Sequence, residues 1–228
     1  MRYIIYLLAC VYVTVTKPAA AQADACDAPM RVMTTDVPPL VEIKYDKPVG
    51  ELTDEVRAYL SSHLSRFSIK HANWARTLKY AEQGRVDAIF PTMYSEERAQ
   101  YLDFSIRAFS TISIGLYAKA STLSTDLELS RQDYVAVIRA VNFDQSVLNG
   151  ARVVEVTDAE QAVKMLEKGR VDYVVGVSEI IKHIIDTNTF TDVSLVKKLE
   201  EHPVYLALSK NALSFPLLKA CLIESKQD

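Results

Sequence analysis

The sequence predicts an α/β protein built from two similar lobes. A helix-to-strand segment occurs twice: LKYAEQGRVDAIFP begins at Leu78, and VKMLEKGRVDYVVG begins at Val163. In both copies an amphipathic stretch ends at a glycine, Gly84 or Gly169, which suits the left-handed position just past a helix C-terminus. A short apolar run follows each glycine and is typical of a strand buried on both faces. The two copies lie too far apart for a solenoid repeat, so they indicate two α/β lobes.

The composition is that of a folded globular protein. The chain has 228 residues, of which 49% are hydrophobic, so it can bury a large core. Its formal net charge of −3 argues against nucleic-acid binding, because such domains usually carry a basic surface. No histidine has cysteine or acidic partners at metal-ligand spacing, and no phosphate-binding, dinucleotide-binding or hydrolase motif occurs. We therefore expect no cofactor and no metal, while catalysis by residues scattered along the sequence stays open.

Residues 1–23 have the pattern of a secretory signal peptide. A basic start precedes an apolar run over 3–15, and an alanine-rich stretch offers cleavage sites from Ala21 to Ala25. The apolar run is shorter than the ~20 residues that span a membrane. We expect cleavage near these alanines and a periplasmic location. A lipoprotein signal ending at Cys10, or a buried N-terminal strand or helix, are the alternatives.

Cleavage of the signal peptide would leave two cysteines, Cys26 and Cys221. An exported protein meets an oxidising compartment, which permits a disulfide between them. Such a bond would tie the new N-terminus to the C-terminal helix. Two independent buried thiols are the alternative, because no sequence fixes the Cα separation that a disulfide needs.

Alternation and helical periodicity predict the elements of the first half. Strands are expected at 31–35, 41–45, 67–70, 86–90 and 111–118, with a turn at 46–50. Apolar residues recur every four positions between 52 and 64, which predicts a helix with Thr53 as its N-cap. Asn73 and Ser95 are the expected N-caps of two further helices. After the strand at 86–90, residues 91–94 are expected to leave the sheet.

The second half repeats this alternation. Strands are expected at 134–138, 152–156, 171–175 and 204–209, and a last helix at 216–224. Asn142 is the expected N-cap of a helix ending at Asn149, and Thr157 with Glu160 forms a capping box. Ser178 begins another helix. Strands alternating with helices imply mostly parallel sheets, which bind ligands outside the carboxyl ends of their strands.

A few side chains are placed to bind a ligand at those strand ends. Arg98 lies one turn inside the helix capped by Ser95, and helical side chains lean toward the N-terminus. Its guanidinium could therefore hold a carboxylate with two hydrogen bonds, or could form an exposed ion pair. Trp74 and Tyr94 flank the same region and could stack on a ligand or pack in the core. Arg139 could be a second cationic anchor or a rim residue.

Taken together, the motifs resemble those of periplasmic solute-binding proteins of family 3, the amino-acid-binding type. The resemblance covers nearly all of the chain after the signal peptide and rests on short motifs: GELTDEV from Gly50, Trp74, GRVDAI from Gly84, SEERA from Ser95, DFS from Asp103, GRVD from Gly169 and LALSK from Leu206. It implies the type II two-lobe fold with two crossing hinge strands. Lobe 1 would comprise 29–113 plus 204–228, and lobe 2 would comprise 114–203.

The resemblance also implies a function. Such a protein captures a small carboxylate-bearing, amino-acid-like solute in an interlobe cleft, as a monomer, for the membrane permease of an ABC transporter. The carboxylate-binding arginine of the family falls on Arg98, with neighbouring ligands near 91–93 and a wall near 37–40. The expected ligand-binding set is Trp74, Thr92, Met93, Tyr94, Arg98, Arg139, Asn142 and Ser178.

The chain also departs from the family pattern. The acid that usually binds the α-amino group falls at Val177, and residues 139–142 replace a small turn of the second lobe. The resemblance therefore leaves the ligand open. Two other functions remain: a dehydratase-like enzyme on the same scaffold, using Glu179 or Glu42 as its cleft acid, and a ligand-sensing component that docks on a membrane receptor.

Overall fold

The computed structural model describes residues 26–122, 127–139, 141, 143–188, 190 and 192–223. The predicted signal peptide, with its cleavage sites, lies outside the described residues, and so does Asn142. No helix within these ranges is long and apolar enough to cross a membrane.

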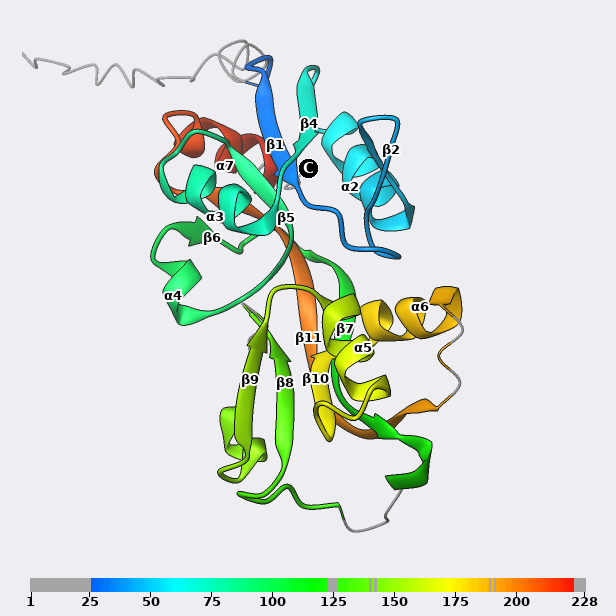
Figure 1. Ribbon diagram of the computed structural model, residues 1–228. Helices are drawn as coiled ribbons and strands as arrows, with labels where there is room; N and C mark the ends of the chain where they lie inside the picture. Colours follow the sequence, from blue (N-terminus) through cyan, green and yellow to red (C-terminus); the bar gives the residue numbers. More distant parts are fainter. Residues whose placement is uncertain are drawn as a thin grey trace, which may run out of the picture.

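The chain folds into two α/β lobes joined by two long strands (Figure 1). The first lobe contains β1 (Met30–Thr34), β2 (Glu42–Lys44), β3 (Lys47–Val49), α2 (Glu51–Ser61), β4 (Phe67–His71), α3 (Trp74–Glu82), β5 (Ala88–Met93), α4 (Glu96–Ala99), β6 (Leu102–Asp103) and α7 (Phe215–Ile223). The second contains the 3₁₀ helices η1 (Ala120–Thr122) and η2 (Gln145–Leu148), β8 (Tyr134–Ile138), β9 (Arg152–Val156), α5 (Ala159–Glu167), β10 (Tyr173–Val177) and α6 (Ser178–Asn188). The joining strands are β7 (Ala108–Lys119) and β11 (Val193–Ser209).

One hydrogen-bonded sheet runs through both lobes. Its strand order is β4-β1-β5-β11-β7-β10-β8-β9, with β6 also paired to β11. In this sheet the pairs within a lobe are parallel, whereas β7 and β11 pair antiparallel with each other and with the strand that each joins; β2 and β3 form a separate antiparallel pair. The prediction of parallel sheets is confirmed inside the lobes. The two crossing strands make the sheet continuous because each is long enough to serve both lobes.

The repeated GRVD tetrads make matching hydrogen bonds in the two lobes. The backbone N–H of Asp87 donates to the carbonyl of Arg31 at 2.8 Å, and that of Asp172 donates to the carbonyl of Tyr134, also at 2.8 Å. In return, the Asp87 carboxylate accepts from the N–H of Arg31 at 2.6 Å, and the Asp172 carboxylate from the N–H of Tyr134 at 2.8 Å. Each aspartate thus fixes the first strand of its own lobe to the strand that follows the tetrad.

The predicted C-terminal ends of these two helices are confirmed, and so are the N-caps at Asn73 and Ser95. Gly84 and Gly169 follow their helices with φ of +66° and +64°, the left-handed conformation that glycine adopts at low cost. The side chains of Asn73 and Ser95 accept hydrogen bonds from the N–H three residues later, as N-caps do.

The prediction for the first helix is wrong at its start. Helix α2 begins at Glu51 with Gly50 as its N-cap, so Thr53 lies inside the first turn. There the Thr53 hydroxyl donates to the carbonyl of Val49 at 3.2 Å. A side chain that bonds back to the preceding turn cannot cap the N–H groups ahead of it.

Two predictions for the second lobe are also wrong, one for a cap and one for a helix. Asp158, not Thr157, caps α5 and accepts from the N–H of Gln161 at 2.7 Å. The helix expected to end at Asn149 is the single 3₁₀ turn η2, and its cap is Asp144. At α5 the acceptor is a carboxylate beside the expected residue, which gives the stronger charge-assisted bond, and at η2 the Asp144 carboxylate accepts from the N–H of Ser146 at 2.9 Å.

Two strands, β5 and β11, are longer than predicted, and β10 is shifted toward the C-terminus. Strand β5 continues through residues 91–93 instead of leaving the sheet, with Thr92 and Met93 paired to β11, and β10 runs from Tyr173 to Val177. The predicted turn at 46–50 contains β3, which forms a hairpin with β2. Strand β11 begins at Val193, eleven residues before the expected start at Val204 (204 − 193), because its first half pairs with β7.

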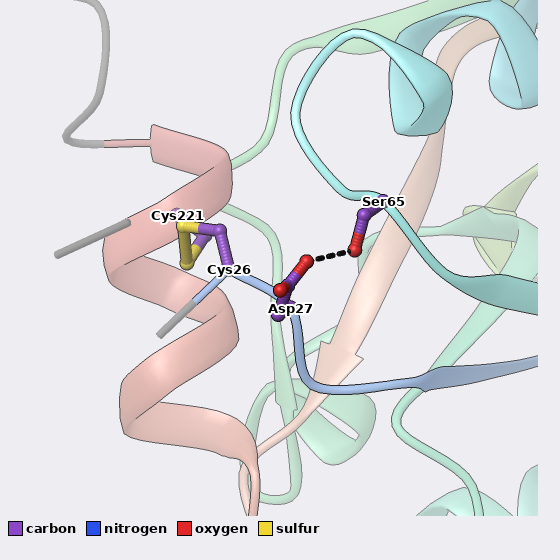
Figure 2. The surroundings of a disulfide bond; sticks show 4 residues. All are labelled: Cys26, Asp27, Ser65 and Cys221. Atoms are coloured by element: carbon purple, nitrogen blue, oxygen red, sulfur yellow. Dashed lines mark hydrogen bonds between the residues drawn. A yellow bond between two sulfur atoms is a disulfide. The ribbon is translucent and has the colours of Figure 1, made fainter. Parts of the chain in front are cut away.

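A disulfide joins Cys26 to Cys221, whose Cα atoms are 5.7 Å apart. Figure 2 shows the bond between the segment leading into β1 and helix α7, beside a hydrogen bond from the Ser65 hydroxyl to the Asp27 carboxylate. The bond therefore fastens the two ends of the described chain to each other on the first lobe.

Candidate ligand-binding cleft

A cleft of about 1050 Å³ lies between the lobes. Its walls follow the carboxyl ends of β1, β4 and β5 in the first lobe, and of β8, β9 and β10 in the second. Helix α6 covers one side, and residues of the crossing strands β7 and β11 contribute as well. The cleft occupies the position expected of a ligand site in parallel sheets.

Arg98 is the buried cation of this cleft. It is 7% exposed and lines the cleft from α4, so the expectation of an exposed ion pair is wrong. Its Nη1 donates to the carbonyl of Met93 at 3.2 Å, and the guanidinium lies 5.4 Å from the centre of the Trp74 ring. Loss of solvent lowers the pKa of Arg98, an effect opposed by Tyr101 and Glu97. An arginine still carries its charge at neutral pH, so the cleft presents a fixed guanidinium.

Four other predicted ligand-binding residues belong to the first lobe, and three of them line the cleft. Thr92 and Met93 do so from the end of β5, and Trp74 from the start of α3. The Thr92 hydroxyl donates to the carbonyl of Met93 at 3.3 Å. Tyr94 does not line the cleft: it is 51% exposed and meets Phe104 edge to face, with ring centres 5.3 Å apart.

The predicted residues of the second lobe are more dispersed. Arg139 lines the cleft, but its side chain is 66% exposed, and its Nη2 lies 3.5 Å from a carboxylate oxygen of Glu155. Ser178 is buried at the start of α6 and does not line the cleft. Its hydroxyl has no hydrogen-bond partner within the described part of the chain, and it packs against Gly115 of β7. These positions give the second lobe no buried cation to match Arg98 among the described residues.

The two acids named for an enzyme lie elsewhere. The Glu179 carboxylate accepts from the backbone N–H and the hydroxyl of Ser113 and is not part of the cleft lining. Glu42 also lies off the lining, and a hydrogen bond from Lys44 lowers its pKa, opposite to what a general acid near neutral pH requires. Val177, between β10 and α6, does line the cleft.

Sequence reasoning missed several polar residues of the cleft. The lining includes Asp36, His71, Asp158, Glu160 and His183. Four of the five follow a predicted strand or stand in the first turn of a predicted helix, so the rule of carboxyl ends could have found them. Within the described ranges, however, no three histidine, cysteine or acidic side chains gather as a metal site.

The lobes, the crossing strands and the interlobe cleft define a two-lobe fold of the periplasmic-binding-protein type. Solved structures share it: a histidine kinase sensor domain with similarity to periplasmic binding proteins has a TM-score of 0.73 and 20% identity, over 87% of this chain and 89% of that chain. The VFT2 domain of Bordetella pertussis BvgS has a TM-score of 0.70 and 18% identity, over 91% of each chain. An ancestral arginine-binding protein bound to arginine has a TM-score of 0.69 and 20% identity, over 89% of this chain and 94% of that chain.

No family model matches the chain, and no curated protein matches it in sequence. The similarity at these identities therefore establishes the fold. The predicted fold class is confirmed, and the resemblance to amino-acid-binding periplasmic proteins is borne out at that level.

Proposed function

We propose that this chain is an exported solute-binding protein that captures a small carboxylate-bearing solute, about the size of an amino acid, between its lobes. The observation that carries this proposal is Arg98, a buried guanidinium in the wall of the cleft with Trp74 beside it. Export rests on the predicted signal peptide at residues 1–23 and the periplasmic location that it implies.

The chemistry of capture follows from the shape of the guanidinium. Its planar N–H groups match the two oxygens of a carboxylate, so one side chain can fix both the position and the orientation of the solute. Trp74 and the Met93 carbonyl hold the guanidinium in place, which lowers the entropy lost when the solute binds.

Closure of the lobes is the second step. A solute that contacts both walls binds the closed form better than the open form, and so shifts the population toward closure. We place the lobe boundaries near residues 113 and 204, inside the crossing strands, which would bend as a hinge.

Delivery to the permease of an ABC transporter is one outcome of closure, and signalling through a membrane receptor is the other. The similarity to the histidine kinase sensor domain and to the BvgS domain favours the second candidate enough to test it. Once a solute is known, uptake of its labelled form by cells with and without this protein separates the two. Lost uptake supports a transporter, whereas unchanged uptake with a lost transcriptional response supports a sensor.

We propose a binding protein instead of an enzyme because the acids of the cleft have local tasks. Asp158 caps α5, and Glu160 pairs with Lys164 at 2.6 Å. Glu179, the acid nearest the chain position at which the family binds an amino group, is held by Ser113 outside the lining.

The test is a thermal-shift screen of the oxidised protein, purified from the periplasm of a bacterial host, against amino acids, dicarboxylates, monocarboxylates and short peptides. A ligand at 100 times its dissociation constant stabilises the folded state by about 2.7 kcal/mol, which raises the melting temperature by several degrees. Arg98→Ala should abolish the shift. Arg85→Ala is the matched control, because Arg85 is exposed in the same lobe, stacks on Tyr80 and does not line the cleft. An unchanged response in Arg98→Ala would overturn the assigned site.

A further inference from the structure

We infer that the solute is a carboxylate with an apolar body and without a cationic amino group. This inference rests on the proposed function and names the ligand class of the same cleft. It follows from what surrounds the buried guanidinium: hydrocarbon on the facing lobe, and acids that already have partners.

The wall contributed by the second lobe carries a set of aliphatic side chains among polar ones. They are Ile138 at the end of β8, Val141 after it, Val177 at the end of β10, and Ile180 and Ile184 on α6. Val177 and Ile180 pack against one hydrophobic cluster, and Ile138 and Ile184 against another, so the cleft meets aliphatic side chains of both clusters.

Residues of the crossing strands extend this surface. Ile112 of β7 and Val204 of β11 are buried and line the cleft. In the first lobe, Val37 and Leu40 add further aliphatic contacts. A solute held by its carboxylate at Arg98 therefore meets hydrocarbon from both lobes, and its body gains free energy by leaving water.

An ammonium group would need an acidic oxygen in the cleft. Three carboxylates line it within the described ranges: Asp36, Asp158 and Glu160. Asp36 accepts from a backbone N–H of β2 at 3.2 Å, Asp158 caps α5, and Glu160 pairs with Lys164. Each already has a hydrogen-bond or ion-pair partner in its own lobe.

The positively charged residues of the lining also argue against an ammonium group on the solute. Arg76, Arg98 and Arg139 all line the cleft, so the described cleft is not an acidic environment that would attract a positive group. Burying an ammonium against valine and isoleucine removes its water without replacing those hydrogen bonds. The same wall favours a neutral substituent, such as a hydrogen, a hydroxyl or a keto oxygen, at the carbon next to the carboxylate.

The experiment compares solutes that differ only in the amino group. The oxidised protein is titrated by calorimetry at neutral pH with 4-methylpentanoate and 4-methyl-2-oxopentanoate against leucine, and with 3-phenylpropanoate against phenylalanine. We expect the acid without the amino group to bind at least tenfold more tightly in the series that fits the cleft, and this binding to be lost in Arg98→Ala.

The outcomes separate this inference from the proposed function. An amino acid that binds as tightly as its deaminated partner, or more tightly, and that needs Arg98, would overturn the inference and leave the proposed function intact. Absence of saturable binding by these acids and by the whole thermal-shift panel would overturn both.

A variant tests the wall directly. Val177→Asp places a carboxylate in the aliphatic surface and should change the leucine-to-methylpentanoate affinity ratio at least tenfold in favour of leucine. Gln145→Glu adds the same charge to an exposed position of the second lobe outside the cleft and should leave the ratio unchanged. An unchanged ratio in Val177→Asp that still melts cooperatively would overturn the role given to this wall. If Val177→Asp does not fold, the wild-type comparison still decides.

Discussion

The carboxylate of Glu179 accepts hydrogen bonds from both the backbone N–H and the hydroxyl of Ser113, each at 3.2 Å. Ser113 lies on the crossing strand β7, and Glu179 lies in the first turn of α6. The helix that covers one side of the cleft is thereby fastened to a strand that joins the lobes. A lobe movement that bends β7 at this point therefore also moves the start of α6.

Removing this fastening should cost stability. We expect Glu179→Ala to lower the free energy of unfolding by about 1.5–3 kcal/mol, the usual range for hydrogen bonds to a charged group, and Glu179→Gln by less because its amide oxygen can still accept. Urea unfolding measures both. Glu167→Ala, an exposed position on α5, should change the free energy by no more than about 0.5 kcal/mol, and an equal loss there would refute the assignment.

Asp87 should make the stability of the protein depend on acid. The residue is 2% exposed, and burial alone raises its pKa, but hydrogen bonds from Arg31 and Ser214 outweigh burial and lower the pKa below its ordinary value. Because the folded-state pKa is below the unfolded-state value of about 3.9, this contribution is present above pH ~4 and is lost as pH falls through the folded-state pKa.

Asp87→Asn should therefore cost about 2 kcal/mol at neutral pH and flatten the decline of stability below pH ~4. Urea unfolding at a series of pH values from neutral to acid measures the effect. The repeat supplies the control, because Asp172 makes the same backbone bonds but is exposed, so Asp172→Asn should cost less than about 1 kcal/mol. Equal costs for the two variants would show that the burial of Asp87 and its pairing with Arg31 add nothing to the free energy of unfolding.

The two repeat glycines should differ in their tolerance of alanine. Both have positive φ, which costs an alanine about 1–2 kcal/mol. At Gly84 an added Cβ would also lie 2.2 Å from the backbone oxygen of Asn211, whereas at Gly169 the nearest group is the flexible Lys119 Nζ at 3.8 Å. We expect Gly84→Ala to lose clearly more than 2 kcal/mol and Gly169→Ala to lose only the conformational cost. Thermal and urea unfolding would show the difference, and similar losses would contradict the close approach at Gly84.

Loss of the disulfide should destabilise the fold without altering the cleft. We expect reduction, or the double variant Cys26→Ser with Cys221→Ser, to lower the free energy of unfolding by about 2–5 kcal/mol. Melting with and without reductant measures this loss, and the double variant should be indifferent to reductant. A reductant-sensitive double variant would point to another cause.

The fold could be predicted well because local signals agreed with it. The repeated tetrad marked one strand in each lobe, and Gly84 and Gly169 marked the helix ends that precede them. Caps were predicted where one polar side chain stood alone, as at Asn73. They failed where a carboxylate stood beside the expected residue, as at Asp158 beside Thr157.

The site could be predicted less completely. Arg98 was predicted from its position in a short helix and from the resemblance. In the structure its guanidinium contacts the Met93 carbonyl and the Trp74 ring. Tyr94 and Ser178 are neighbours of cleft residues in sequence but face away from the lining, since the direction of a side chain at a strand end depends on the packing of distant elements. The aliphatic wall on α6 is periodic, yet periodicity does not say whether it meets the core or the cleft.

The bond between Cys26 and Cys221 has a mechanical consequence. Both cysteines sit on the first lobe (Figure 2), and all of the second lobe lies in the chain between them. A pull applied at these two residues is carried by the sulfur–sulfur link, so no tension enters β7, β11 or the lobe beyond them. The two-lobe unit can thus be attached at this edge. A force applied there does not strain the crossing strands while the cleft opens and closes.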